Sequence, residues 1–434
     1  MSGVLQRRAA IVVFLAFAFA YFLSALIRAV TATLAPTLAQ EFALQASDLG
    51  LLAGGFFLGF AATQLPMGTW LDQYGPRKVM LGFLGVAVAG CLVFSAATGF
   101  SGLLAGRMLC GAGVSACLMA PLTGYRRWFD ATTQMRANSW MLMTGSLGMV
   151  ASTLPVQWAL PLFGWRPLFW GLAGLIALAM GGIALWVPRW AVSVQGAARS
   201  DSAGGRVDPA ATATTTATAA ADMPHGYAMV WRHPYFRRVA PLGFFIYGVM
   251  VAMQTLWAGP WMQRVAGYTP LESATGLFWI NASMLCAFWT WGMLNPWLLR
   301  KGFHADRLMA AGVPVCLVVL LGIILAGPQA GGWAWALFCV SCTFVALSQP
   351  AVALAFPQAL AGRALSAYNL VIFAGVFVVQ WGIGLAVDTF AARGLSTVAS
   401  FQLAMAVCLA CNTAAYVSYM LMGQRHNVRQ TSTP

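Results

Sequence analysis

The chain has 434 residues, of which 60% are hydrophobic and 8% are charged, and its formal net charge at pH 7 is +14. Soluble globular proteins carry about 25% charged residues, so the composition excludes that class. The 10 acidic and 24 basic residues are spread over short polar segments, and this distribution argues against nucleic-acid binding. The apolar residues come in runs of about 20, the length that an α-helix needs to cross about 30 Å of hydrocarbon. We therefore expect an all-α integral membrane protein.

Apolar windows between polar breaks predict twelve transmembrane helices in two groups of six. The run that starts at Ile11 is too long for the apolar part of a signal peptide, so we interpret it as a retained first helix. The first six spans are predicted near residues 11–36, 48–70, 78–98, 102–125, 138–160 and 166–188. The second six are predicted near residues 239–262, 272–298, 307–327, 332–355, 364–387 and 398–422.

A polar stretch at 189–237 separates the two groups of spans. It contains a low-complexity piece, 209–221, and is predicted to be a flexible cytoplasmic linker. We therefore expect an N-terminal six-helix bundle at 1–188, a C-terminal six-helix bundle at 238–423 and a cytoplasmic tail at 424–434. Six spans, a linker and six spans are typical of a duplicated membrane bundle.

The basic residues predict the orientation of the chain in the membrane. With the N-terminus, the linker and the C-terminus in the cytoplasm, nearly all of the 24 basic residues are cytoplasmic, and the outer loops hold only Arg166, Arg264 and Arg393. This asymmetry follows the positive-inside rule. We expect a multi-pass protein of a bacterial-type cytoplasmic (inner) membrane that is embedded in the lipid bilayer and functions as a monomer.

The loop between the second and third spans reads GTWLDQYGPRK. Here Gly68 permits neighbouring helices to approach, Gly75 permits a tight turn, and Asp72 can accept a hydrogen bond from Arg77 or from a helix N-terminus. Together with Lys78, this spacing resembles the G-x-x-x-D-x-x-G-x-[RK]-[RK] signature of the major facilitator superfamily (MFS). The resemblance implies a fold of two six-helix bundles, in which these five residues form a cytoplasmic latch rather than a substrate site.

Other segments extend the resemblance along the chain. Residues 107–113 are similar to the R-x-x-x-G-x-G pattern of the family's fourth span, and residues 164–169 are similar to the G-W-R-x-x-F that opens its sixth span. The eleventh span carries Gly382, Gly384 and Asp388, like the G-x-x-x-D ending of the family. The resemblance covers essentially the whole chain but does not name a substrate.

Two arginines lie inside predicted spans. Arg28 is in the outer third of the first span and Arg107 in the outer third of the fourth, and the family resemblance implies that both helices line one cavity. An arginine within a membrane costs about 2.5–3.5 kcal/mol and should therefore have a partner. None of the 10 acidic residues is placed to be that partner, because all of them lie at the ends of spans or outside them. The partner is then water, a backbone carbonyl or an anionic substrate, whose carboxylate suits the planar guanidinium group.

The start of the chain also resembles the organic-anion (anion:cation symporter) branch of the family. Arg28 stands eight residues before Pro36, and the first span closes with the Q-E-F of residues 40–42. The branch usually has an acid where this chain has Ile27, and often a second acid where it has Val114. Because those acids are associated with proton coupling in relatives, their absence favours facilitated diffusion or anion exchange.

Polar and aromatic residues of the other spans either line the cavity or bridge neighbouring helices. Besides Arg28 and Arg107, the candidate substrate-binding residues are Tyr21, Gln64, Gln254, Trp257, Asn281, Gln349, Asn369 and Gln380. Gln254 and Trp257 are three residues apart, so they are expected to share one helix face. No P-loop, nucleophile elbow or zinc motif occurs, and we expect no catalytic residue, no metal and no cofactor.

These observations favour a secondary active or facilitative transporter that moves a small organic anion of the carboxylate type by alternating access. The alternative is an exporter of amphipathic drugs or metabolites in which Arg28 and Arg107 are structural. The fifth span lacks the clear glycine–proline pattern typical of drug exporters. A membrane receptor would be expected to carry a structured soluble attachment, and an enzyme is the least favoured class.

Overall fold

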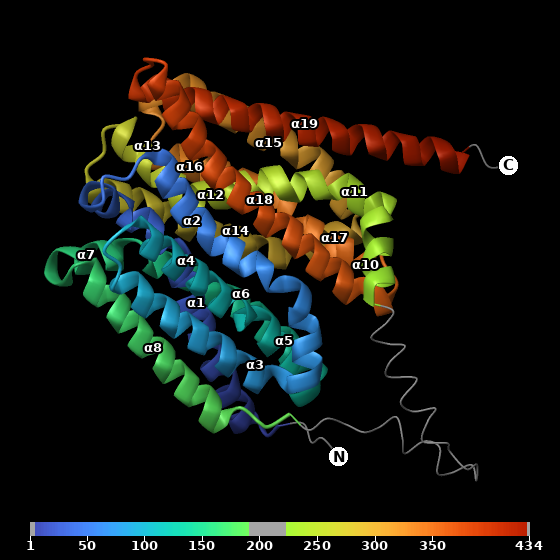
Figure 1. The fold of residues 1–434 in the computed structure, drawn as a ribbon. Coiled ribbons are helices and arrows are strands. Elements are labelled where there is room, and N and C mark those ends of the chain that lie inside the picture. Colours follow the sequence, from blue (N-terminus) through green and yellow to red (C-terminus); the bar gives the residue numbers. More distant parts are fainter. Residues whose placement is uncertain (1–4, 191–222, 432–434) are drawn as a thin grey trace, which may run out of the picture.

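The computed structural model describes residues 5–190 and 223–431, which contain helices and no strand (Figure 1). We call residues 5–190 the N-terminal half and residues 223–431 the C-terminal half. In Figure 1 the N-terminal half, blue to green, lies below the C-terminal half, yellow to red.

The elements of the N-terminal half are α1 (Arg7–Glu41), α2 (Ala46–Ala62), α3 (Gln64–Ser95), α4 (Phe100–Val114), α5 (Ala116–Trp128), α6 (Ala131–Ala151), α7 (Leu154–Phe163) and α8 (Trp165–Trp186). The elements of the C-terminal half are α10 (Met223–Arg232), α11 (Pro234–Pro241), η1 (Leu242–Tyr247), α12 (Gly248–Ala252), η2 (Met253–Trp257), α13 (Ala258–Arg264), α14 (Pro270–Arg300), α15 (Ala305–Ala326), η3 (Gly327–Gln329), α16 (Gly332–Ser341), η4 (Cys342–Leu347), α17 (Ser348–Leu354), α18 (Gln358–Ala392) and α19 (Thr397–Thr431). Both η1 and η2 are π-helical, whereas η3 and η4 are 3-10 helices.

The helices of the structure cover the predicted spans, but several spans consist of more than one helical element. Within the described residues, 10 helical stretches are long and apolar enough to cross a membrane. The pair Thr132–Ala151 and Leu154–Phe163, bent by 43°, adds an eleventh if the two helices form one span. The 17-residue helix α2 is shorter, and the chain continues through Thr63 into the first part of α3 to complete a twelfth. The prediction of an all-α membrane fold is confirmed.

Gly75 divides α3 into two helical pieces that belong to successive spans. Its φ of 76° and ψ of 163° lie in a region that residues with a side chain avoid. The indole of Trp190 also fills the space that a Cβ atom at residue 75 would need. Pro76 begins the second piece, since the ring of proline favours the first turn of a helix. The predicted tight turn therefore lies at Gly75.

The two halves contact each other closely where α2 lies beside α18 (Figure 1). The carbonyl oxygen of Gln380 lies where a Cβ atom of Gly50 would be, and the carbonyl oxygen of Ala46 lies where a Cβ atom of Gly384 would be. Glycine at both positions lets the two helix backbones approach. We call this end of the molecule, where α2 begins and α18 ends, the closed end.

Asp388 adds a charged contact at the closed end. Its carboxylate accepts hydrogen bonds from the backbone N–H groups of Ala46 at 3.1 Å and Ser47 at 2.7 Å. These residues form the N-terminus of α2, which carries a partial positive charge that an acid stabilises by roughly 0.3–1 kcal/mol. An acid of the C-terminal half therefore caps a helix of the N-terminal half.

Several predicted boundaries differ from the observed ones. The low-complexity piece at 209–221 lies outside the described residues. α10 and α11 occupy the end of the predicted linker, and the helical stretch of the seventh span begins at Pro234. α19 continues to Thr431, through most of the predicted tail. The differences arise because hydropathy marks the apolar part of a helix, whereas the helix itself can continue through polar residues.

Replacing Gly384 with alanine tests the helix contact at the closed end. The added Cβ atom would collide with the α2 backbone at Ala46, so we expect a lower melting temperature of the purified protein in detergent. Gly382 offers a matched control on the same helix, because a Cβ atom there meets nothing within 4 Å. Gly382→Ala should keep or raise the melting temperature, since alanine favours a helix over glycine by about 1 kcal/mol. Equal melting temperatures for the two variants would contradict the contact.

Candidate functional site

A cavity of about 850 Å³ lies between the two halves. Its walls come from α1, α5 and α6 of the N-terminal half and from η2, α14 and α18 of the C-terminal half, among others. The lining reaches Trp140 and Met293, whose side chains are 60% and 62% exposed. Both residues lie away from the closed end, Trp140 in the middle of α6 and Met293 in the last third of α14. The cavity therefore opens at the end of the molecule opposite to the closed end, which we call the open end.

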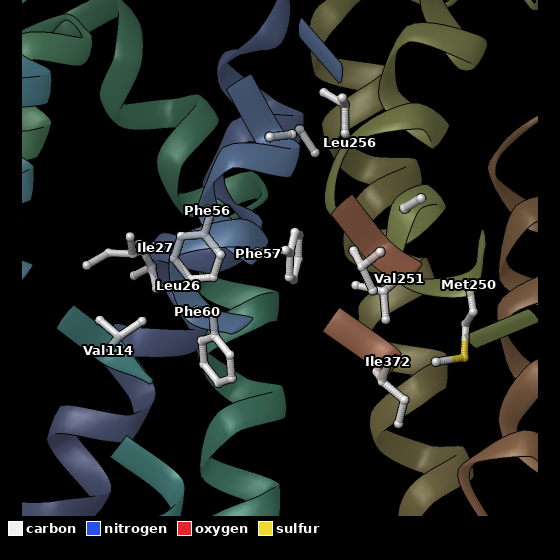
Figure 2. Packing of buried hydrophobic residues seen from close by; sticks show 14 of the residues in the cluster. Leu26, Ile27, Phe56, Phe57, Phe60, Val114, Met250, Val251, Leu256 and Ile372 are labelled. Atoms are coloured by element: carbon white, nitrogen blue, oxygen red, sulfur yellow. The ribbon is translucent and has the colours of Figure 1, made fainter. Parts of the chain in front are cut away.

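Figure 2 shows buried apolar side chains that belong to both halves. In Figure 2, Phe60 belongs to the N-terminal side and Met250 and Val251 to the C-terminal side, and all three line the cavity. The ring of Phe60 lies 4.3 Å, centroid to centroid, from the ring of Phe373 on α18. The ring of Phe57 stacks on Phe373 at 6.3 Å. These aromatic contacts join α2 and α18 beside the cavity.

Arg28 gives the cavity its charge, because no other described lining residue is formally charged. Tyr21, Ala25 and Arg28 line the cavity from successive turns of α1, as the helical repeat of 3.6 residues requires. The guanidinium carbon lies 5.7 Å from the ring centroid of Phe60, and the buried Nε has no hydrogen-bond partner among the described residues. The charge thus has an aromatic neighbour but no carboxylate to pair with.

Arg107, in contrast, does not line the cavity, and its side chain is 1% exposed. Its Nη1 donates to the carbonyl oxygen of Ile27 at 2.8 Å, and its Nη2 donates to that of Arg28 at 3.5 Å. The guanidinium carbon also lies 4.8 Å from the ring centroid of Phe56. The helices of both arginines line the cavity, α4 through Val114, but of the two arginine side chains only that of Arg28 does so. Arg107 instead joins α4 to the turn of α1 that carries Arg28.

The other candidate residues divide in the same way. The lining includes Tyr21, Gln64, Gln254, Asn281, Gln349 and Asn369. Trp257 and Gln380 are not part of it. The indole Nε1 of Trp257 donates to the carbonyl oxygen of Gln380 at 3.0 Å, and the Gln380 amide donates to Thr255 Oγ1 at 2.8 Å. These two residues bridge helices, which was the alternative considered for polar residues within spans.

The expectation that Gln254 and Trp257 share one helix face is wrong. Both belong to η2, the π-helical turn Met253–Trp257, in which hydrogen bonds reach five residues back instead of four. The wider turn changes the direction in which residues three apart project. Gln254 consequently lines the cavity, while Trp257 contacts α18.

The sequence analysis did not single out most of the aromatic and methionine residues of the lining. The aromatic ones are Phe60, Trp140, Tyr247, Phe288, Trp289, Trp291 and Phe373. The methionines are Met119, Met143, Met149, Met250, Met284 and Met293. Nothing in the sequence separates these residues from the many others that face lipid or neighbouring helices. A weak signal exists in span 7, where Tyr247, Met250, Val251 and Gln254 follow a helical spacing.

The five predicted latch residues lie at the open end, where Arg77 makes a hydrogen bond and Gly68 makes no close helix contact. Arg77 donates to the carbonyl oxygen of Ala184 on α8, within its own half. Neither of the two ion pairs of the described residues, Arg166–Glu41 and Arg238–Asp306, includes Asp72, Arg77 or Lys78. Gly68 is exposed, with nothing within 4 Å of its Cβ direction, so the expected close helix approach at this residue is wrong.

Comparisons with known proteins identify the family. The family model described as Major Facilitator Superfamily matches residues 17–380. The chain belongs to the Major Facilitator Superfamily. Its fold agrees: the POT family transporter PepTSo superposes with a TM-score of 0.74 at 15% identity, covering 98% of this chain and 99% of that one. A bacterial homologue of the human lysosomal transporter Spinster, in an inward-facing and unoccupied conformation, superposes with a TM-score of 0.73 at 15% identity, covering 96% and 98%.

Curated MFS relatives share parts of the sequence. The 4-hydroxybenzoate transporter PcaK of Acinetobacter baylyi is 25% identical over 316 residues, which are 68% of this chain and 66% of the relative. The nitrate/nitrite transporter NrtP of Picosynechococcus sp. is 32% identical over 111 residues, 26% and 21% of the two chains. Probable anion transporter 6 of Arabidopsis thaliana is 31% identical over 143 residues, 32% and 27%. The matched stretches span about two thirds of these relatives or less, and the family and these relatives are transporters rather than enzymes.

The two arginines should affect stability in opposite ways. Arg107→Met removes hydrogen bonds from a charged donor to buried carbonyls, so we expect the free energy of unfolding to fall by about 1.5–3 kcal/mol. Arg28→Met removes a charge without a hydrogen-bonded partner, so the melting temperature should stay unchanged or rise. Melting curves of the purified variants in detergent test both expectations. A fall for Arg28→Met as large as that for Arg107→Met would contradict the difference between the sites.

Proposed function

We propose that this MFS transporter moves a small organic anion of the carboxylate type by alternating access, as a secondary active or facilitative carrier. One observation carries the proposal: Arg28 is the charged group of the described cavity lining, and its guanidinium lacks a hydrogen-bonded partner there. A carboxylate would neutralise the charge through two parallel N–H···O bonds. The printed names of the relatives, which refer to 4-hydroxybenzoate, nitrate or anions, support an anionic substrate.

The orientation of the basic residues supports a direction for the cavity. By the positive-inside rule the open end is cytoplasmic, so the structure corresponds to an inward-facing state of a multi-pass protein in the cytoplasmic (inner) membrane. We propose that the N-terminal bundle at 1–188 and the C-terminal bundle at 238–423 rock about the cavity, as in other duplicated transporters. The latch residues Gly68, Asp72, Gly75, Arg77 and Lys78 would then join the halves in the outward-facing state. A monomer suffices for this cycle.

The lining also bears on energy coupling. The described lining residues include no Asp, Glu or His, which are the side chains that relay protons in membrane carriers. We therefore propose uniport or anion exchange in place of proton symport.

An exporter of amphipathic drugs or metabolites is the second candidate. The aromatic and methionine side chains of the lining favour it, because they adapt to apolar molecules of varied shape. In that case Arg28 would contribute to structure alone, and neutral molecules would be transported as well as anions.

Substituting Arg28 separates the two candidates. A thermal-shift panel of organic carboxylates and neutral analogues on the purified protein selects the ligand, and uptake of that ligand into proteoliposomes follows. Arg28→Lys keeps the charge but loses the planar fork, so we expect uptake to fall about tenfold, the equivalent of 1.4 kcal/mol. Arg28→Met should abolish it. Arg393→Lys, an exposed arginine beyond α18, is the matched control and should transport normally. Unchanged uptake by both Arg28 variants would refute the proposal and favour the exporter.

Proton flux tests the coupling. Substrate that enters proteoliposomes down its own gradient, or in exchange for trapped unlabelled substrate, should leave the internal pH unchanged, because neither uniport nor anion exchange moves a proton. The test requires a carboxylate that stays ionised at the assay pH, since a protonated acid would carry the proton itself. Uptake that depends strictly on an inward proton gradient would show that a proton relay exists.

A further inference from the structure

Two amide side chains form a polar relay in the cavity wall of the C-terminal half. The Nδ2 of Asn281 on α14 donates to the carbonyl oxygen of Leu277 at 2.9 Å. The Nε2 of Gln254 on η2 donates to the Oδ1 of Asn281 at 3.0 Å. Both amide side chains line the cavity.

The order of these bonds fixes which way each amide points. A backbone carbonyl only accepts hydrogen bonds, so Asn281 must turn its NH₂ group toward Leu277 and its oxygen toward Gln254. Gln254 must then turn its own NH₂ group toward Asn281. The atom that remains is the Gln254 Oε1, an acceptor without a hydrogen-bond partner among the described residues. The relay therefore presents an acceptor rather than a donor.

The position of this acceptor makes it significant for binding. Gln254 is 7% exposed as a whole residue and lines the cavity, so its Oε1 is an acceptor that a ligand in the cavity can use. Arg28 belongs to the N-terminal half and Gln254 to the C-terminal half. A ligand that satisfies both side chains therefore bonds to both halves of the molecule.

The rest of the lining limits the charge and the shape of such a ligand. Because Arg28 is the one formally charged group of the described lining, a second carboxylate on the ligand would enter without a cation to pair with. Rings such as those of Phe60, Tyr247 and Phe373 offer flat apolar surfaces on which a planar body can pack.

We propose that the transported anion is a ring-bearing monocarboxylate with a hydroxyl group, and that Gln254, oriented by Asn281, accepts a hydrogen bond from this hydroxyl. Gln254 is thus a specificity-determining residue, and Asn281 is a positioning residue that acts through it. The inference rests on the proposed carboxylate transport and adds the class of its substrate.

Uptake of three benzoate derivatives into proteoliposomes of the full chain tests the inference. We expect 3- or 4-hydroxybenzoate to be transported with a kcat/KM about tenfold above that of benzoate, because only the hydroxyl satisfies the acceptor. Phthalate, with its second carboxylate, should be transported more slowly than benzoate. These comparisons use the wild-type protein and do not depend on the folding of any variant. Equal transport of benzoate and both hydroxybenzoates, or fast transport of phthalate, would overturn the proposal.

Variants then assign the selectivity to the relay. Gln254→Met has a similar length but no amide acceptor, so the ratio of kcat/KM for hydroxybenzoate to that for benzoate should fall to about one. Asn281→Leu frees the Gln254 amide to rotate and should reduce the selectivity in part. Gln157→Leu, on α7 and outside the lining, makes a comparable change and should keep the wild-type ratio.

The outcomes distinguish this inference from the proposed function. If Arg28→Met abolishes uptake of every carboxylate while Gln254→Met leaves the ratio of hydroxybenzoate to benzoate unchanged, the carrier function stands and the role of Gln254 is overturned. If the wild-type protein transports no carboxylate and none shifts its melting temperature, the proposed function fails, and the inference fails with it.

Discussion

A single uncompensated charge in the cavity wall sets the chemistry of this transporter. A guanidinium group cannot lose its proton in a protein, so Arg28 must be solvated or paired in every state of the cycle. Its backbone neighbours give no help, because the carbonyl oxygens of Ile27 and Arg28 already accept hydrogen bonds from Arg107. Arg107 therefore has two effects: it holds α1 against α4, and it leaves Arg28 to the cavity. Water can satisfy Arg28 while the cavity is open, whereas an anion can satisfy it when the cavity closes.

Because the two halves meet at the closed end, the charge of Arg28 is reached from the open end of the cavity. At the closed end, glycines let α2 and α18 approach to backbone contact, and Asp388 caps the N-terminus of α2. These contacts join the two halves, but each is small. A helix cap contributes roughly 0.3–1 kcal/mol, so the contact can break and re-form during transport.

The sequence predicts the all-α membrane architecture well because the length of apolar runs reflects the thickness of the membrane. Gly75, Gly384 and Asp388 were recognised by family spacing, and the structure gives each a local reason. The partner of Arg107 was not predictable, because any backbone carbonyl of a neighbouring helix can accept from a guanidinium. The misplacement of Trp257 has a different cause: a π-helical turn changes the helical phase, and the sequence of η2 carries no signal for it. Lining aromatics resemble lipid-facing aromatics, since both sit among apolar residues on long helices.

In the proposed function, binding and alternating access are linked through the side chains that the substrate would contact on each half. A ligand held by Arg28 alone would move with the N-terminal half and would not stabilise the approach of the C-terminal half. A ligand that also bonds to Gln254 lowers the energy of the state in which both walls are near, and this difference in affinity is what shifts a conformational equilibrium. Since η2 contacts α1 directly, a small rotation between the halves changes the separation of these two side chains. The amide relay can thus couple the recognition of a hydroxyl group to the closing of the cavity.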